Sequence, residues 1–310
     1  MRSVYMGTPD FAVLPLQKMI DCGQPPLAVF SKPDRAKGRG KKIAPTPVKA
    51  AALAAGLPVY QPQSVNSPEA VEILRDLRPD LLVVAAYGQI LRRPVLELPP
   101  MGIINVHASL LPAYRGAAPI QRAIINGERE TGVTIMFIEE GLDCGDMLLR
   151  RAIPIGPEED AASLHDRLSR LGAEMLVEAL DLLERGEAHA VPQDDEKATF
   201  APMLTKDDEK LDWTQPAAAL HNRIRGMNPF PGVYAFYNGK RLKIKKAACA
   251  GEAALPHRPG EILSLDGETV RVAAGSGTVI LQAVQPEGKG VMSAGAFARG
   301  YALRPGDCLL

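Results

Sequence analysis

The chain has 310 residues, of which 46% are hydrophobic, and its 36 basic and 36 acidic residues give a net charge of zero. This length exceeds the usual size of one domain, so we expect two domains, each with its own core. The balanced charge argues against nonspecific binding of DNA, and no apolar run approaches the roughly 20 residues that span a bilayer. The four cysteines are scattered without a C-x-x-C pair, which predicts neither disulfides nor a metal site. We therefore expect a cytoplasmic protein.

The first 140 residues alternate between short apolar runs and amphipathic segments. This alternation predicts an α/β domain of the Rossmann-like class, with a mostly parallel sheet and helices on both faces. The first turn has one glycine, Gly7, where a dinucleotide-binding G-x-G-x-x-G turn needs three, so we predict no dinucleotide. We expect strands near 4–7, 27–30, 81–86, 102–106 and 134–138, and helices near 11–22, 47–55, 69–77 and 119–126.

A basic loop follows the second expected strand. Between Lys32 and Lys49, seven residues are basic and only Asp34 is acidic. Counterion release makes such a cluster an effective surface for phosphates even when the total charge is zero. A mobile charged loop without a specific partner is the alternative.

The most informative segment, residues 102–119, joins a buried strand to a loop rich in proline and glycine. Side chains two residues apart on a strand share a face, so Asn105 and His107 should lie side by side at its carboxyl end. In parallel α/β sheets this edge is where ligands bind. An amide beside an imidazole can stabilise an oxyanion and move a proton, so we predict a catalytic site here.

A second apolar run, residues 132–138, leads into a glycine-rich turn that contains Asp143. We predict that Asp143 is the partner of His107, because a nearby carboxylate fixes the imidazole tautomer and favours its protonated form. An ordinary Asx-turn is the alternative. Covalent catalysis by Ser109 or Cys144 is disfavoured, because the chain has no G-x-S-x-G elbow and no base adjoins Cys144.

The later part of the chain has a different pattern. An amphipathic helix is expected over 161–185, and short strands separated by glycine turns, from residue 233 to 283, suggest a small barrel. We expect a first domain over 1–188, a polar linker over 189–207 and a second domain over 208–310. In the last of these, Arg241, Lys243 and Lys245 alternate with other residues and should share the solvent face of one strand, which could bind phosphates or only water.

Several motifs together resemble the methionyl-tRNA formyltransferases. They are VYMGTPDFA, SKPDRAKGRGKKIAPTPVK, VVAAYGQIL, NVHASLLPAYRGAAPIQ, TGVTIMFIEEGLDCGDML and NPFPG. The resemblance implies direct transfer of a formyl group from 10-formyltetrahydrofolate to the methionine carried by initiator tRNA. It also implies that Asn105, His107 and Asp143 are catalytic, that no metal or covalent intermediate is needed, and that the C-terminal domain is an OB-like barrel.

The same resemblance assigns two binding regions. For the folate it implies Ser109, Leu110, Leu111 and Pro112, whose backbone would line the site, together with Tyr87, Gly88 and Ile90 around the pterin. For the acceptor stem of the tRNA it implies Lys37, Arg39, Lys41 and Lys42. From the charged strand face of the second domain we also expect Lys243 and Lys245 to contact tRNA. The expected state is a monomer.

Two other functions stay open at this point. The acceptor could be a small amine, such as a glycinamide ribotide or an amino-sugar nucleotide, although the basic loop and the second domain argue against it. The chain could also be an RNA-binding module on an inactive enzyme scaffold. The presence of Asn105, His107 and Asp143 argues against that alternative.

Overall fold

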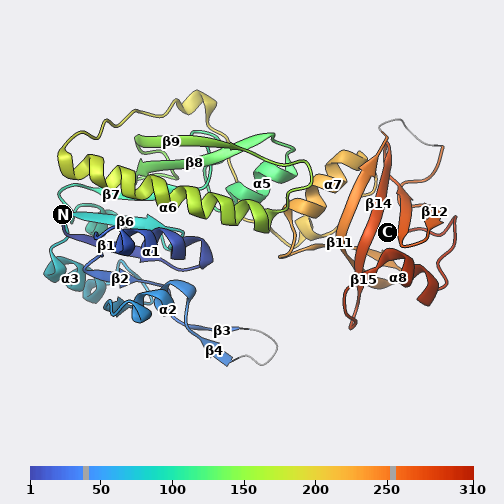
Figure 1. The fold of residues 1–310 in the computed structure, drawn as a ribbon, viewed down its shortest axis with the longest axis horizontal. Coiled ribbons are helices and arrows are strands. Elements are labelled where there is room, and N and C mark those ends of the chain that lie inside the picture. Colours follow the sequence, from blue (N-terminus) through green and yellow to red (C-terminus); the bar gives the residue numbers. More distant parts are fainter. Residues whose placement is uncertain (38–41, 252–255) are drawn as a thin grey trace. The chain divides into compact units, whose positions relative to one another are not determined.

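The computed structural model describes residues 1–37, 42–251 and 256–310 (Figure 1). The chain divides into two compact units. The first consists of Met1–Gly116, Thr131–Ile153 and His165–Phe200, and the second of Ala117–Glu130, Pro154–Leu164 and Ala201–Leu310. The predicted domain limits of 1–188, 189–207 and 208–310 stay a prediction.

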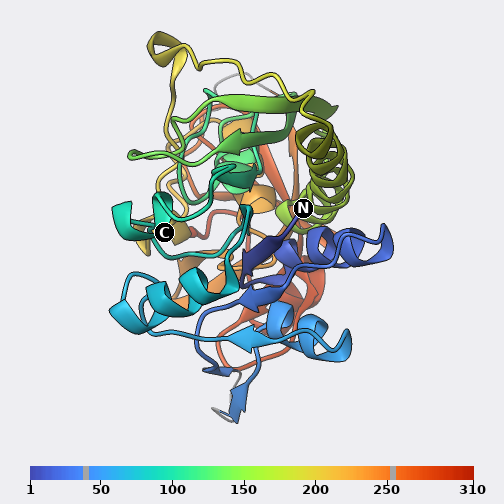
Figure 2. The ribbon, with the colours of Figure 1, turned by 90° about the vertical axis from the view of Figure 1, so that its left-hand side faces the viewer.

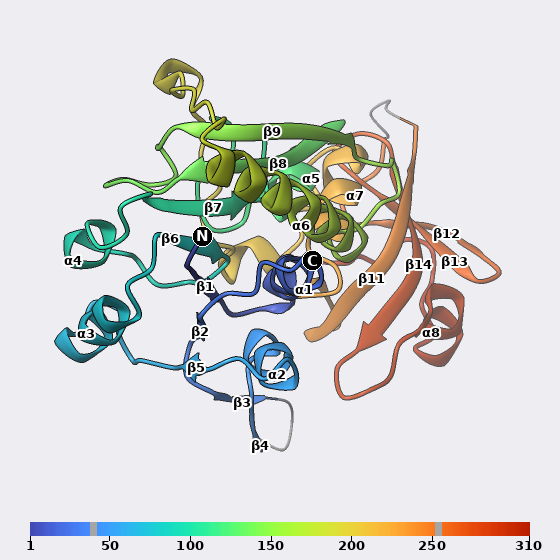
Figure 3. The same cartoon turned by 60° about the vertical axis from the view of Figure 1, so that its left-hand side comes forward.

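A seven-stranded sheet forms the centre of the first unit, and Figure 3 shows its strands in spatial order. The first five strands of this order pair in parallel, whereas β7 and β8 are antiparallel. The mostly parallel sheet that the sequence predicts is therefore confirmed. The order is β5 (Val59–Tyr60), β2 (Ala28–Phe30), β1 (Ser3–Gly7), β6 (Leu81–Ala85), β7 (Ile103–His107), β8 (Glu130–Phe137) and β9 (Met147–Pro154).

Helices cover both faces of this sheet. Helices α1 (Val13–Asp21), α2 (Pro47–Ala54) and α6 (Ala161–Arg185) lie on one face, and α3 (Pro68–Leu77) and α4 (Arg93–Leu96) on the other (Figure 2). Two of the helix starts follow from local chemistry. Thr46 and Ser67 each accept a backbone N–H three residues on, and each is followed by a proline at the first helical position.

Helix α6 has the bounds that the sequence predicts and packs against the sheet with its leucine-rich side. Gly172 marks its closest approach, because a Cβ atom built there would lie 2.7 Å from Val106 Cγ1 on β7. Ser169 adds a polar tie, since its hydroxyl donates to the carbonyl of Phe11 at 2.8 Å. The apolar residues Leu171 and Leu183 of this helix are half-buried, and its buried ones are Leu164, Leu168, Met175, Leu176 and Leu180.

We expect Gly172→Ala to lower the free energy of unfolding. Alanine gains about 1 kcal/mol over glycine in a helix, but overpacking a filled core costs typically 1–3 kcal/mol. The second effect should win because Val106 is held in a central strand. Urea unfolding of Gly172→Ala can be compared with Gly300→Ala, whose added Cβ meets no atom within 4 Å. A rise in stability for Gly172→Ala would show that helix and strand are not packed this closely.

The second unit is built on an antiparallel sheet. Its pairings run β10-β11-β14-β13-β12, and β15 (Met292–Ser293) adds to β14. Among the described residues the strand ladders form one open path. Backbone hydrogen bonds of the C-terminal residues join its two ends, since Leu310 bonds with Phe236 of β10 and Asp307 with Ile262 of β12. The structure has an antiparallel sheet here, and the predicted barrel stays a prediction. The strands are β10 (Val233–Tyr237), β11 (Lys240–Ala250), β12 (Ile262–Asp266), β13 (Thr269–Ala273) and β14 (Thr278–Pro286), and the helices are α5 (Pro119–Ile125), α7 (Ala217–Gly226) and α8 (Ala294–Gly300).

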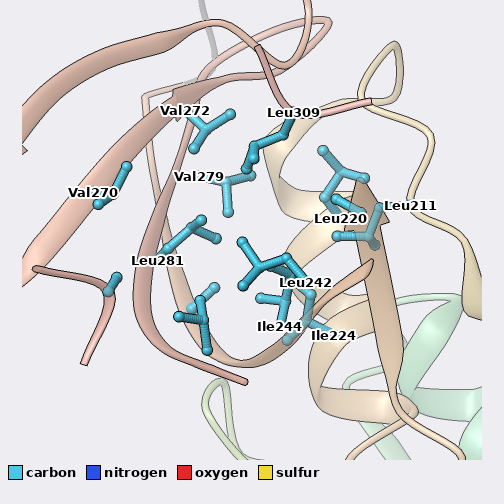
Figure 4. Close-up of a cluster of buried hydrophobic side chains, with 14 of the residues drawn as sticks. Leu211, Leu220, Ile224, Leu242, Ile244, Val270, Val272, Val279, Leu281 and Leu309 are labelled. Carbon is cyan, nitrogen blue, oxygen red and sulfur yellow. The ribbon is translucent and has the colours of Figure 1, made fainter. Parts of the chain in front are cut away.

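One hydrophobic cluster holds this second unit together, as Figure 4 shows. Alternate residues of the strands, such as Leu242 and Ile244, point into it and meet Leu220 and Ile224 from α7. Leu309 also belongs to this cluster and is 1% exposed. Residues 1–37, 42–251 and 256–310 contain no helix that is long and apolar enough to cross a membrane.

Candidate active site

Strand β7 presents Asn105 and His107 on one face at its carboxyl end. Asn105 pairs with Val84 of β6 on one side and Met136 of β8 on the other, and His107 lies opposite Thr134. Only 9% of Asn105 and 5% of His107 is exposed. In the part of the chain that the structure describes, the Asn105 side chain makes no hydrogen bond, so its amide N–H groups are available to an oxyanion.

The imidazole of His107 has an oxygen atom beside each nitrogen. Nδ1 lies 3.7 Å from Oδ2 of Asp143, and Nε2 lies 3.1 Å from the carbonyl oxygen of Tyr114. Each ring nitrogen therefore faces an acceptor oxygen. The structure thus brings together the three residues, Asn105, His107 and Asp143, that the sequence analysis placed in the catalytic site.

Asp143 is held by its backbone as well as by its carboxylate. Its φ angle is +49°, in the left-handed region that residues other than glycine seldom adopt. Oδ2 accepts the backbone N–H of Gly116 at 2.8 Å, and the carbonyl oxygen accepts a bond from Gln193 Nε2 at 2.9 Å. The turn is therefore ordered by groups that lie far away in the sequence.

The loop after His107 is fixed from inside the sheet by Thr134. The Thr134 hydroxyl donates to the carbonyl of Ser109 at 2.7 Å and accepts the N–H of Leu111 at 3.2 Å. Sequence reasoning missed this residue, although a hydroxyl in the buried run GVTIMFI signals a hydrogen-bonding role. Of the loop residues expected at the folate, Ser109 and Leu111 are fully buried, while Leu110 and Pro112 are half-buried.

The loop after β6 holds the other three residues that the resemblance assigns to the folate. Tyr87 is 1% exposed within a hydrophobic cluster, and burial raises the pKa of its hydroxyl. Gly88 has φ +77°, and a Cβ there would lie 2.6 Å from Lys32 Nζ. Ile90 is 81% exposed, and Leu142 of the Asp143 turn is 56% exposed. Apolar side chains left open on two such loops fit a flat heteroaromatic ligand.

The basic loop is described only in part. Its flanks form a small ladder of β3 (Arg35–Lys37) and β4 (Lys42–Ala44), in which Lys37 pairs with Lys42. Arg39 and Lys41, which the sequence analysis assigns to RNA, lie outside the described residues. Lys49 is engaged within the protein, since its ammonium group contacts Asp34 and Gln61, each at 2.6 Å. The hydrogen bond from Lys49 and a second one from Gln61 Nε2 lower the pKa of the Asp34 carboxyl.

The hairpin of β10 and β11 carries positive charge between aromatic rings. Arg241 and Lys243 are exposed, and the Arg241 guanidinium lies 4.3 Å from the ring centre of Tyr234. Tyr234 in turn meets Phe236 edge to face. Lys245 differs from its two neighbours in the pattern, because it is half-buried with Nζ 3.4 Å from the carbonyl of Pro229. The pairing of β11 with β14 shifts register between Ile244 and Lys246, which interrupts the alternation at Lys245.

Family profiles match both halves of the chain. The formyl transferase profile matches residues 1–180, and the profile of the formyl transferase C-terminal domain matches residues 203–302. The chain belongs to the formyl transferase family. Among its relatives, methionyl-tRNA formyltransferase of Geobacter sulfurreducens is 50% identical over 309 residues, which cover 100% of this chain and 96% of the relative. The enzyme of that name from Moorella thermoacetica is 48% identical and is covered to 99%.

Several solved structures share the fold. The sugar 3N-formyl transferase WlaRD, solved with dTDP and 5-N-formyl-THF, superposes with a TM-score of 0.67 at 18% identity, over 93% of this chain and 98% of that one. HypX of Aquifex aeolicus, in complex with tetrahydrofolic acid, gives a TM-score of 0.65 at 19% identity, over 98% of this chain and 48% of its own. In the described part of this formyl transferase, no group of three or more His, Cys, Asp or Glu residues could hold a metal ion.

Proposed function

We propose that this formyl transferase moves the formyl group of 10-formyltetrahydrofolate to the α-amino group of methionine on initiator tRNA, giving N-formylmethionyl-tRNA. The observation that carries the proposal is the placement of Asn105, His107 and Asp143 at the end of β7. Relatives named methionyl-tRNA formyltransferase, about 50% identical over the whole chain, support the choice of acceptor.

The reaction that these residues suit is direct transfer through a tetrahedral intermediate. The neutral amine attacks the formyl carbon, a new C–N bond forms, and the bond from that carbon to the folate nitrogen N10 breaks. The amine loses one proton and N10 gains one. The Asn105 amide and the charged imidazole of His107 stabilise the oxyanion, while Asp143 orients the imidazole and balances its charge. No metal and no covalent enzyme intermediate take part.

The folate would lie along the loops that follow β6 and β7. Ser109, Leu110, Leu111 and Pro112 supply backbone and apolar contacts, and Tyr87, Gly88 and Ile90 lie on the neighbouring loop. Support comes from the ordered backbone of the first loop and the exposed apolar side chain at the tip of the second. Flat ligands are bound by this combination of apolar walls and fixed polar groups.

The tRNA would contact two basic surfaces. The first is the loop with Lys37, Arg39, Lys41 and Lys42, which would receive the acceptor stem. The second is the β10–β11 hairpin with Lys243 and Lys245, in a domain that we propose to be OB-like. Exposed cations beside aromatic rings, as at Arg241 and Tyr234, suit nucleic-acid backbones and bases. We further propose that the protein acts as a monomer in the cytoplasm.

The proposal is tested by following labelled formyl from 10-formyltetrahydrofolate. Charged initiator methionyl-tRNA is compared with uncharged tRNA, free methionine, glycinamide ribotide and an amino-sugar nucleotide. We expect label on the charged tRNA alone. Label on a small amine would support formyl transfer as the reaction but refute methionyl-tRNA as the acceptor. Tight tRNA binding without transfer would favour an inactive RNA-binding scaffold.

Arg39→Leu should lower kcat/KM for charged tRNA by at least tenfold and leave the KM for the folate unchanged. Removing one cation that contacts the acceptor stem weakens tRNA binding and alignment, whereas the folate has no need of it. Steady-state kinetics with each substrate varied in turn provide the measurement. Arg78→Leu, a change at the end of α3, serves as the matched control. If Arg39→Leu and the control have equal kinetics, Arg39 does not contact the tRNA.

A further inference from the structure

Gln193 lies in the segment that the sequence analysis treated as a linker, yet its side chain makes four hydrogen bonds within the first unit. Its Nε2 donates to the carbonyl oxygens of Asp143 at 2.9 Å and Gly145 at 2.8 Å. Its Oε1 accepts from Nε and Nη2 of Arg115, at 3.1 and 2.8 Å. The primary amide is therefore saturated, and it connects the Asp143 turn to the loop that follows β7.

Arg115 is the other half of this connection. It is only 6% exposed, and besides Gln193 it contacts the carboxylate of Asp195 at 2.7 Å. A buried guanidinium keeps its position only when its N–H groups are paired, and here both partners come from residues 193–195. The fork of Arg115 is thus anchored by the supposed linker.

Thr199 ties the same two segments together through the backbone. Its hydroxyl accepts the N–H of Tyr114 at 2.9 Å, and its carbonyl accepts the N–H of Arg115 at 2.8 Å. Residues 193–199 therefore hold Tyr114 through its backbone and Arg115 through both its backbone and its side chain.

Residues 114–116 contact both members of the catalytic pair. The carbonyl of Tyr114 faces Nε2 of His107, and the N–H of Gly116 donates to Oδ2 of Asp143. Any shift of residues 114–116 would move an acceptor away from the imidazole and a donor away from the carboxylate. The left-handed backbone of Asp143 makes outside support more important, because that conformation is disfavoured without it.

We infer that Gln193, together with Arg115, is a positioning residue for formyl transfer: it holds the Asp143 turn and residues 114–116 so that Asp143 stays aligned with His107. This inference rests on the proposed catalytic roles of His107 and Asp143. Gln193 lies in no reacting position itself, so its effect is exerted through Asp143.

The test uses two substitutions that separate the functions of the amide. Gln193→Met keeps the length of the side chain and removes every hydrogen bond. Gln193→Glu keeps an acceptor for Arg115, and strengthens that pair, but loses the donor to the carbonyls of Asp143 and Gly145. Lys197→Met is the matched control, because Lys197 lies in the same segment and contacts Asp194 outside the connection.

We expect both Gln193 variants to lose 10- to 100-fold in kcat, with the KM for the folate changed less than threefold. Exchange of the Gly116 amide hydrogen should become faster in both, and the control should change neither quantity. In an Asp143→Asn background, Gln193→Met should reduce kcat by less than threefold, because the group that it positions has already lost its charge.

Three results would overturn the inference. They are a kcat within threefold of the unsubstituted protein, unchanged exchange at Gly116, or an equal loss of kcat in the Asp143→Asn background. A merely structural role would lower thermal stability and kcat together without coupling to Asp143. The proposed catalytic role of Asp143 is tested separately: full activity of the single variant Asp143→Asn would refute that role. If Gln193→Met does not fold, Gln193→Glu carries the test.

Discussion

His107→Asn should lower kcat for formyl transfer by about 10³-fold. Asparagine occupies a similar volume at the end of β7, but it has no charge to stabilise the oxyanion and no proton to transfer. The loss should appear in kcat, while the KM for the folate stays within a few-fold, because Thr134 and not the imidazole holds the backbone of Ser109 and Leu111.

The measurement is steady-state transfer to charged initiator tRNA, with circular dichroism and thermal unfolding to show that the variant is folded. His189→Asn is a matched control, since His189 is exposed and belongs to no catalytic contact. Activity of His107→Asn within tenfold of the unsubstituted protein would mean that His107 takes no part in the chemical step.

Asp143→Asn should lower kcat by about 10²- to 10⁴-fold. The substituted side chain can still accept the N–H of Gly116 through its amide oxygen, so the turn should keep its shape. What it loses is the negative charge beside Nδ1 of His107, which favours the imidazolium and fixes the orientation of the ring. The expected variant is folded, binds both substrates and transfers formyl slowly.

Glu140→Gln is the control for this loss, because it removes a negative charge from an exposed position of the same turn. Kinetics of both variants are measured with tRNA and folate varied separately. If Glu140→Gln and Asp143→Asn lose equal activity, the loss comes from the summed negative charge of the turn. A specific contact between Asp143 and His107 would then be rejected.

Much of the fold follows from local patterns in the sequence. Alternating apolar runs predict the parallel strands, and helical spacing predicts α6 with its observed ends. Strand β9 was missed because it has exposed arginines in its middle and therefore lacks a clear period of two. Helix α8 was missed because it is short and rich in alanine and glycine, although Ser293 caps it in the ordinary way.

The barrel shows where local patterns are insufficient. The short strands predicted between residues 233 and 283 exist. Whether a sheet closes depends on strand tilt and stagger, and no single strand encodes either. The strand ladders form an open path, and backbone hydrogen bonds of Leu310 with Phe236 and of Asp307 with Ile262 join its two ends. The half-burial of Lys245 likewise depends on strand pairing, because the register shift at Lys245 exists only where β11 pairs with β14.

The sequence by itself determined the parallel sheet, the shared face of Asn105 and His107, and the chemistry that an amide, an imidazole and a carboxylate can perform. Tertiary structure alone decided that Asp143 lies 3.7 Å from His107 and that Gln193 and Thr199 support the loops around them. The physical reason is separation along the chain. Periodicity records which face of an element is buried, but a hydrogen bond between residues 50 or more positions apart leaves no periodic trace.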